Sequence, residues 1–297
     1  MNQPVRRRWR RVDGVLLLDK PTGITSNDAL QKARRLFSAE KAGHTGTLDP
    51  MASGLLPVCF GEATKFSADL LDADKTYEAM LRLGVTTTTA DAEGEVIETR
   101  PVAAAEADLL ALLPRFTGAI SQVPPMYSAL KRDGRPLYEL ARQGIEVERA
   151  ARDVTIHELT LLGFSGSDVS LRVSCSKGTY IRTLAEDIGK ALGCGAHLTA
   201  LRRTRVGPLD LAGARTLAEI DGCDEAGRES LLLPVDTLLR GLPPVTLDEA
   251  ATLRFGNGNP VDTDLVGPCR VYAGNRLLGL GLGDGAGRLH PKRLVAK

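Results

Sequence analysis

The chain has 297 residues, of which 43% are hydrophobic and 25% are charged, and its formal net charge is +1. This composition is ordinary for a soluble globular protein, and the length favours one large domain or a large and a small one. The balanced charge does not by itself suggest a nucleic-acid partner. No apolar run could span a bilayer and the amino terminus lacks the apolar core of a signal peptide, so we expect a cytoplasmic protein with no membrane partner.

The 5 cysteines are scattered along the chain, odd in number, and free of any C-x-x-C pair. This pattern fits a reducing compartment and argues against a disulfide frame or a zinc site. We interpret them as small buried hydrophobic residues. They are Cys59, Cys175, Cys194, Cys223 and Cys269.

Basic residues gather in two places although the whole chain is nearly neutral. Five arginines surround Trp9, and a second group lies near residue 203. Local basic patches can bind phosphate on a neutral protein, but a solvated arginine tail and an exposed turn would give the same pattern. The two groups are Arg6, Arg7, Arg8, Arg10 and Arg11, and Arg202, Arg203 and Arg205.

The first third of the chain predicts a strand, a helix and a loop with the character of a site. Gly14 to Leu18 is a short apolar run that predicts a buried strand, and Thr25-x-x-Asp28 is a capping box that begins a helix. Gly43 to Gly54 reads G-H-T-G-T-L-D-P-M-A-S-G, and its glycines and proline let the backbone turn sharply and approach a ligand. A strand over Leu55 to Phe60 and a helix over Glu62 to Leu71 follow.

The middle of the chain alternates between strands and helices. Apolar and polar residues alternate from Tyr77 to Leu83, which predicts a half-buried strand, and Thr86 to Glu95 is a polar loop. Ala104 to Phe116 predicts a helix. Met126 to Arg152 is basic and glycine-rich with little periodicity, so we expect an extended, mobile surface insertion.

Two further strands, over Val154 to Leu162 and Val169 to Cys175, precede a helix that starts near Arg182 and ends at Gly193. Leu201 to Val206 is another strand candidate, and Pro243-Pro244 marks a domain boundary.

Val261 to Lys297 is dense in glycine, with a hairpin expected at Ala273-Gly274-Asn275, and is typical of a small β-barrel-like module. Strands and helices without strict βαβ order indicate an α+β fold.

From the residues alone, Asp49 is ambiguous, because Leu-Asp-Pro commonly begins a turn and the carboxylate could simply bond backbone amides. Other polar groups also stand at the ends of elements, namely His44, Lys20, Tyr180 and Arg182. Their spacing along the sequence does not show whether they meet in space.

Six motifs, in this order, make the chain resemble the bacterial tRNA pseudouridine synthase B (TruB) family from about Gly14 to the carboxyl terminus. They are D-K-P-x-G at Asp19 to Gly23, G-x-L-D within Gly43 to Gly54, K-x-Y at Lys75 to Tyr77, P-x-Y-S-A-L-K at Pro125 to Lys131, G-T-Y-I-R-x-L-A at Gly178 to Ala185, and L-R-R-T at Leu201 to Thr204. The resemblance implies isomerisation of the T-loop uridine of tRNA (position 55) to pseudouridine, with no cofactor and no metal.

The resemblance also implies roles for single residues. Asp49 would be the catalytic carboxylate, acting as a nucleophile at C1′ or C6 or by assisting glycal formation, and these alternatives stay open. Arg182 would hold it ionised through two parallel hydrogen bonds. Tyr77 would stack on the flipped base and remove the C5 proton, although alternation alone would make it a core tyrosine.

Four residues are expected to bind the substrate. By resemblance, His44 displaces the base from its stack, Tyr180 and Leu201 line the pocket, and Lys20 supports the pocket electrostatically. A loop histidine, core residues and a surface lysine would be the ordinary interpretations of these four residues.

The expected architecture is a mixed, largely antiparallel central sheet flanked by helices, with a C-terminal module of the PUA type. We predict a basic tail over residues 1–12, a catalytic domain over 13–244 that contains a thumb-like RNA-binding insertion over 126–152, and an RNA-binding module over 245–297. The expected partner is the T-arm of tRNA, with no guide RNA, no obligate protein partner and a monomeric state.

Three other functions compete with this one. The same scaffold could serve as an RNA-binding or RNA-folding protein without chemistry, or as a guide-RNA-dependent enzyme like dyskerin, although the long lysine-rich tails of that family are absent. A nucleotide enzyme that binds phosphate through the glycine loop lacks the G-x-x-x-x-G-K-[ST] arrangement.

Overall fold

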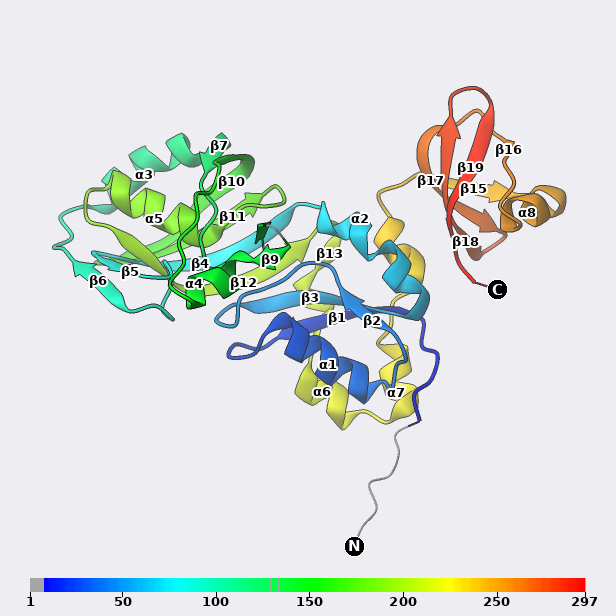
Figure 1. Cartoon of the computed structure of the whole chain (residues 1–297), viewed down its shortest axis with the longest axis horizontal. Coiled ribbons are helices and arrows are strands. Elements are labelled where there is room, and N and C mark those ends of the chain that lie inside the picture. Colours follow the sequence, from blue (N-terminus) through cyan, green and yellow to red (C-terminus); the bar gives the residue numbers. More distant parts are fainter. Residues whose placement is uncertain (1–7, 129, 133, 297) are drawn as a thin grey trace, which may run out of the picture.

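A computed structural model describes residues 8–128, 130–132 and 134–296 (Figure 1). Most of the chain folds around one ten-stranded sheet with helices packed on it, and the carboxyl-terminal residues form a separate five-stranded sheet. In the described part of the chain, no helix is both long and apolar enough to cross a membrane.

The large sheet has the strand order β14-β1-β3-β12-β4-β11-β10-β7, with β13 paired to β12 and β2 paired to β3. Only β1 with β14 and β3 with β12 are parallel, and the other pairs are antiparallel. The predicted mixed, largely antiparallel α+β fold is therefore confirmed. The strands are β1 (Gly14–Lys20), β2 (Ala42–His44), β3 (Ser53–Phe60), β4 (Lys75–Leu83), β7 (Gly118–Gln122), β10 (Arg152–Ser165), β11 (Asp168–Cys175), β12 (Ala196–Val206), β13 (Leu209–Asp210) and β14 (Arg215–Thr216).

Helices cover this sheet in separate groups, seen at the left and at the bottom of Figure 1. The longest are α1 (Ser26–Leu36) and α5 (Ile181–Ala191). The others are η1 (Gly61–Phe66), α2 (Ser67–Leu71), α3 (Glu106–Leu112), η2 (Leu113–Phe116), α4 (Leu137–Arg142), η3 (Leu211–Gly213), α6 (Leu217–Gly222), α7 (Glu225–Ser230) and η4 (Val235–Leu239).

Hydrophobic patterning explains how the two long helices are placed. Alternate residues of β4, such as Leu81, join the core beneath α5, which contributes Leu184 and Ile188. On the other side of the cleft described below, α1 packs Ala29 and Ala33 against β1 and β3. A capping box between Thr25 and Asp28 begins α1, as the sequence predicts. Both helices begin at the same cleft.

Some segments differ from their predicted conformation. The Gly43 to Gly54 loop begins and ends in strands β2 and β3. The predicted polar loop Thr86 to Glu95 begins inside β5 (Val85–Thr87) and ends directly before β6 (Val96–Thr99), and these two strands pair with each other. Strand β7 was not predicted. The insertion at 126–152 contains the ribbon β8 (Lys131–Arg132) and β9 (Arg135–Pro136) and the helix α4, while residues 129 and 133 lie outside the described part.

The carboxyl-terminal sheet has the order β15-β17-β18-β19-β16 and carries one helix. The predicted hairpin is confirmed, because only Gly274 and Asn275 separate β17 from β18. Hydrogen bonds and an ion pair join this module to the segment after β3: Lys65 Nζ donates to Leu294 O (3.0 Å), Ala296 N donates to Glu62 Oε2 (2.7 Å), and Arg293 Nη1 lies 3.3 Å from Asp69 Oδ2. The elements are β15 (Pro244–Leu247), α8 (Glu249–Gly256), β16 (Val261–Asp262), β17 (Val266–Ala273), β18 (Arg276–Asp284) and β19 (Arg288–Leu294).

Candidate active site

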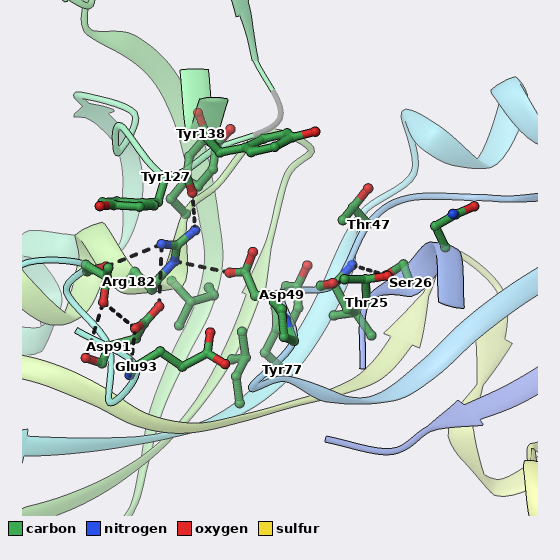
Figure 2. A pocket seen from close by; sticks show the side chains of 18 of the residues that line it. Thr25, Ser26, Thr47, Asp49, Tyr77, Asp91, Glu93, Tyr127, Tyr138 and Arg182 are labelled. Atoms are coloured by element: carbon green, nitrogen blue, oxygen red, sulfur yellow. Dashed lines mark hydrogen bonds and ion pairs between the residues drawn. The ribbon is translucent and has the colours of Figure 1, made fainter. Parts of the chain in front are cut away.

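A cleft of about 570 Å³ opens between the first turns of α1 and α5. Six of the seven predicted site residues line it, although they come from four distant parts of the chain (Figure 2). They are His44, Asp49, Tyr77, Tyr180, Arg182 and Leu201. The seventh, Lys20, does not line the cleft.

The backbone on both sides of Asp49 is fixed by hydrogen bonds to the start of α1. Ser26 Oγ donates to Leu48 O (3.0 Å) and accepts from Leu48 N (2.7 Å), and Gly23 N donates to Pro50 O (2.8 Å). Ser26 is buried, so water does not compete for these bonds. The Asp49 carboxylate is therefore presented to the cleft by a braced loop.

The Lys20 side chain supports the backbone of the Asp49 loop. Its side chain is fully buried, and its ammonium donates to the carbonyls of Pro21 (2.8 Å), Ile24 (2.8 Å) and Pro50 (3.4 Å). Burial lowers the pKa of Lys20 to about 8, and the nearby Asp49 carboxylate opposes part of this shift. Lys20 acts on Asp49 through its charge and through the loop backbone.

Arg203, on β12, holds the other side of the same loop. Its guanidinium is buried and donates to Leu55 O (2.8 Å), Gly46 O (3.1 Å) and Thr47 O (3.4 Å). Here β3 approaches β12 so closely that a Cβ on Gly54, whose φ is +100°, would lie 2.3 Å from Arg203 O. Only glycine fits this position without a shift of the backbone.

Arg182 lies in the first turn of α5, as predicted, and only 5% of its side chain is exposed. Its Nε is 3.1 Å from Asp49 Oδ2, and its Nη1 is 3.5 Å from Asp91 Oδ2 (Figure 2). The remaining donors reach Tyr127 O (2.7 Å) and Thr89 O (3.3 Å). The guanidinium thus connects two carboxylates and two backbone segments.

Asp49 differs from its predicted electrostatics in two ways. The structure shows one contact from Arg182 to Asp49, through Nε, and not two parallel hydrogen bonds, while Nη1 and Nη2 contact Asp91, Thr89 O and Tyr127 O. In addition, the pKa of Asp49 is raised above its ordinary value, because desolvation outweighs the attraction of Arg182 and the charge of Asp91 adds to the rise. The contact with Arg182 therefore holds the Asp49 carboxylate in position, although burial disfavours its ionised form.

Tyr77 stands on β4, whose neighbour β12 places Arg203 opposite it in the strand register. Burial raises the pKa of the Tyr77 hydroxyl, while the charge of Arg203 and a hydrogen bond from it act in the opposite direction. Leu201, two residues before Arg203, is buried and adds an apolar wall to the cleft.

Tyr180 and His44 complete the predicted set. Tyr180 is fixed through its backbone, since its N–H donates to Gln122 Oε1 (3.1 Å) and its carbonyl accepts from Gln122 Nε2 (3.3 Å). His44 ends β2, and within the described residues its buried Nδ1 has no hydrogen-bond partner. Burial, assisted by the charge of Arg203, lowers the pKa of His44 and favours the neutral ring.

Sequence reasoning missed several residues of this cleft. Asp91 and Glu93 line it from the segment interpreted as a polar loop, and Tyr127 and Tyr138 line it from the insertion. Three acids in a threonine-rich loop were the only visible signal, and nothing in the sequence linked Asp91 to Arg182, which is 91 positions later. Within the described residues, no group of three or more His, Cys, Asp and Glu side chains is arranged to hold a metal ion.

The fold resembles that of chains in solved H/ACA ribonucleoprotein and Cbf5 complexes. A structure of an H/ACA ribonucleoprotein bound to a substrate RNA containing 2′-deoxyuridine matches 96% of this chain and 85% of its own chain, with a TM-score of 0.73 and 26% identity. A Cbf5–Nop10–Gar1 complex matches 96% and 84%, with a TM-score of 0.72 and 30% identity. The sheet and its helices are those of the pseudouridine synthase fold.

Family models match almost the whole chain. Residues 34–181 match the TruB family pseudouridylate synthase N-terminal domain, 182–240 the tRNA pseudouridylate synthase B C-terminal domain, and 243–295 the C-terminal pseudouridine synthase II TruB model. The tRNA pseudouridine synthase B of Dechloromonas aromatica is 65% identical over 98% of both chains, and that of Burkholderia mallei is 60% identical over 96% of this chain and 98% of its own. The chain belongs to the TruB family of pseudouridine synthases.

Proposed function

We propose that this enzyme isomerises the T-loop uridine of tRNA to pseudouridine, and that Asp49 is the catalytic carboxylate. The observation that carries this proposal is the meeting of Asp49, Arg182 and Tyr77 in one cleft, which has the size and the apolar and aromatic lining expected for a flipped base. The names of the relatives, which are tRNA pseudouridine synthases, supply the substrate class.

The reaction breaks the N1–C1′ bond of uridine, turns the base and forms a C5–C1′ bond. C5 loses its proton and N1 gains one, so atoms and electrons balance without water or an oxidant. Asp49 would act in its ionised form, either as a nucleophile or by assisting glycal formation. Arg182 would fix its position, and the low exposure of Arg182 would keep that contact strong.

Tyr77 is our candidate for the group that takes the C5 proton. A tyrosine is a useful base only when its phenolate is accessible, and burial of Tyr77 alone disfavours that form. The Arg203 guanidinium would offset part of this effect, because a positive charge next to the hydroxyl stabilises the phenolate, although burial has the larger influence on the pKa of Tyr77. Tyr77, Tyr180 and Leu201 would hold the base, and His44 would contact the RNA from which the base has been withdrawn.

We further propose that the insertion at 126–152 and the module at 245–297 bind tRNA outside the cleft, and that residues 13–244 form the catalytic domain. The insertion supplies Tyr138 and Arg142 to the rim of the cleft, and the guanidinium of Arg142 lies 5.6 Å from the centre of the Tyr138 ring. An aromatic ring beside a cation is suited to a nucleotide. We expect a monomer that works on tRNA in the cytoplasm without a guide RNA or an obligate protein partner.

Mapping of pseudouridine in an unmodified tRNA transcript tests the substrate position. The expected result is one new pseudouridine, in the T-loop, and none in a transcript in which that uridine is replaced by cytidine. Modification at another position would contradict the proposed site. Binding without modification of any transcript would favour an RNA-binding or RNA-folding role.

A further inference from the structure

The basic segment at the amino terminus has no part in the cleft, yet its described residues are fixed to the fold. Arg10 N donates to Ser38 O (2.8 Å), Glu40 N donates to Arg10 O (3.0 Å), and the Arg10 side chain donates to Phe37 O (3.2 Å). This segment therefore pairs with the connection between α1 and β2, and Figure 1 shows it beside the ends of α1 and α7.

Trp9 is held on this surface by an arginine. The Arg34 guanidinium lies 4.6 Å from the centre of the indole ring and is itself fixed by Ala39 O (2.9 Å) and Glu40 O (2.8 Å). Trp9 as a whole residue nevertheless stays 40% exposed. A preorganised cation–aromatic pair is thus presented to solvent.

The charges of this region divide into two sets. Arg10 is paired with Glu225 (2.9 Å) and Glu229, and Arg11 is paired with Asp13 (3.1 Å). Four other cations are exposed and form no ion pair within the described residues. Exposed acids lie in the same region: Glu40, Asp28, which is four residues before Lys32 on α1 and whose pKa that lysine helps to lower, and Glu225 and Glu229, which pair with Arg10. These cations are Arg8, Lys32, Arg35 and Lys41. With Trp9 and Arg34, we call them the N-terminal basic patch.

Two elements lead from the cleft to this patch. Helix α1 starts at the cleft rim with Ser26 and Asn27 and carries Arg35 in its last turn, about 14 Å along the helix axis. Strand β2 has His44 in the cleft at one end and directly follows Lys41 at the other. At about 3.4 Å per nucleotide of one strand, the spacing of B-form DNA, about 14 Å corresponds to roughly four nucleotides, and the shorter rise of an RNA helix makes the number slightly larger.

We propose that the N-terminal basic patch binds the backbone of the same RNA a few nucleotides away from the base held in the cleft, with Trp9 stacking on an unpaired base or packing against a sugar. The inference rests on the proposed function for the presence of RNA in the cleft. Its own support is the geometry: exposed cations and an arginine-backed indole lie along α1 beyond its first turn and at the start of β2, and each of these two elements has its other end at the cleft. Phosphate contacts of this kind position an RNA without reading its sequence.

The test measures the binding of an unmodified tRNA transcript as a function of salt, with Asp49→Asn present in every variant so that no RNA is converted. Lys32→Gln/Arg35→Gln removes two cations of the patch. The matched control is Arg115→Gln/Lys190→Gln, which removes two exposed cations that form no ion pair in the described part of the chain, one of them in the last turn of α5, the other helix that begins at the cleft.

For the patch variant, we expect the slope of log K against log salt to become shallower by about two, because each phosphate contact contributes roughly 0.9. The control should keep the slope of the parent. Trp9→Ala should weaken binding about tenfold with the slope retained, since stacking releases no counterions. An unchanged slope in the patch variant, or equal changes in patch and control, would overturn the proposal. If the wild-type enzyme failed to isomerise uridine, the proposed function would be contradicted but this proposal would not, because this experiment measures RNA binding.

Discussion

Asp91 Oδ2 lies 3.5 Å from Arg182 Nη1, so the arginine that holds Asp49 also faces a second, buried carboxylate. Asp91 is itself fixed, because its other oxygen accepts from the Glu93 N–H (3.0 Å). The three groups form a chain in which Asp91 positions Arg182 and Arg182 positions Asp49. Asp91 also raises the pKa of Asp49 through its negative charge.

Asp91→Asn should therefore have two separable effects. The maximal rate should fall on the order of 10–100-fold, because Arg182 loses a partner that fixes its geometry. The acid limb of the pH–rate profile should move to lower pH, because removal of a negative charge lowers the pKa of Asp49 and the ionised form then persists to lower pH. Single-turnover rates between pH 4.5 and 8 measure both, and an acid limb that moves upward would contradict this account.

The position of Lys20 predicts a loss of chemistry with RNA affinity retained. Lys20→Met removes the ammonium that donates to Pro21 O and Ile24 O, and it removes the weaker of two donors to Pro50 O, which keeps its hydrogen bond from Gly23 N. No contact with substrate is removed, because Lys20 does not line the cleft. We expect a rate about tenfold lower at saturating enzyme. The affinity for tRNA should stay within about twofold, and a large fall in affinity would place Lys20 in direct contact with RNA.

The lowered pKa of Lys20 also predicts how stability depends on pH. Its pKa is about 8 in the folded protein and 10.5 in the unfolded chain, so between these values the unfolded state binds more protons. The stability of wild type should therefore rise with pH through this window relative to Lys20→Met. Urea unfolding at pH 7.5 and pH 9.5 checks the sign. If the unfolding free energy of wild type minus that of Lys20→Met falls as pH rises, Lys20 is not desolvated as described.

The contact between Gly54 and Arg203 can be tested with a matched glycine. Gly54 (φ +100°) and Gly178 (φ +81°) both adopt conformations that favour glycine, but only at Gly54 would a Cβ collide with backbone. Gly178→Ala should cost about 1 kcal/mol of unfolding free energy. Gly54→Ala should cost several times more or give insoluble protein. Equal costs, measured by urea unfolding, would show that β3 and β12 do not meet as described.

Arg203 is predicted to act on both Tyr77 and the Asp49 loop. Arg203→Lys keeps the charge near Tyr77 but loses the fork that reaches Gly46 O, Thr47 O and Leu55 O, whereas Arg203→Met loses both. Isomerisation should be slowed more by Met than by Lys. In a Tyr77→Phe background the difference between Lys and Met should shrink, because no hydroxyl remains to respond to the charge. If the rate difference between Arg203→Lys and Arg203→Met is the same in the Tyr77→Phe background, Arg203 acts only by supporting the loop.

Local patterns in the sequence predicted most of the fold. The capping box at Thr25, the alternation after Tyr77 and the glycine after Ala273 each specify local structure through neighbouring residues, and all three elements are present. Strand β7 was missed because Gly118 to Gln122 has no clear alternation of apolar and polar residues. Its place is set by pairing with β10, far along the chain.

The candidate site was only partly predictable, because its electrostatics arise from tertiary contacts. Motifs identified Asp49 and Arg182 but not Asp91, whose importance depends on a contact with Arg182 across the sheet. The motifs also predicted that an arginine lowers the pKa of Asp49. In the structure, desolvation by the surrounding cleft has the larger effect, and the pKa is raised. The net sign of a pKa shift depends on burial, which no local pattern in the sequence contains.

The role of Asp49 is tested most directly by tritium release from a tRNA transcript labelled at uridine C5, because C5 must lose its hydrogen when it bonds to C1′. Wild type and Asp49→Asn would be compared at enzyme concentrations that saturate RNA binding. We predict release from the T-loop uridine by wild type, no release by Asp49→Asn, and similar affinities for the transcript. Release by Asp49→Asn at the wild-type rate would contradict the assignment of Asp49 as the catalytic carboxylate.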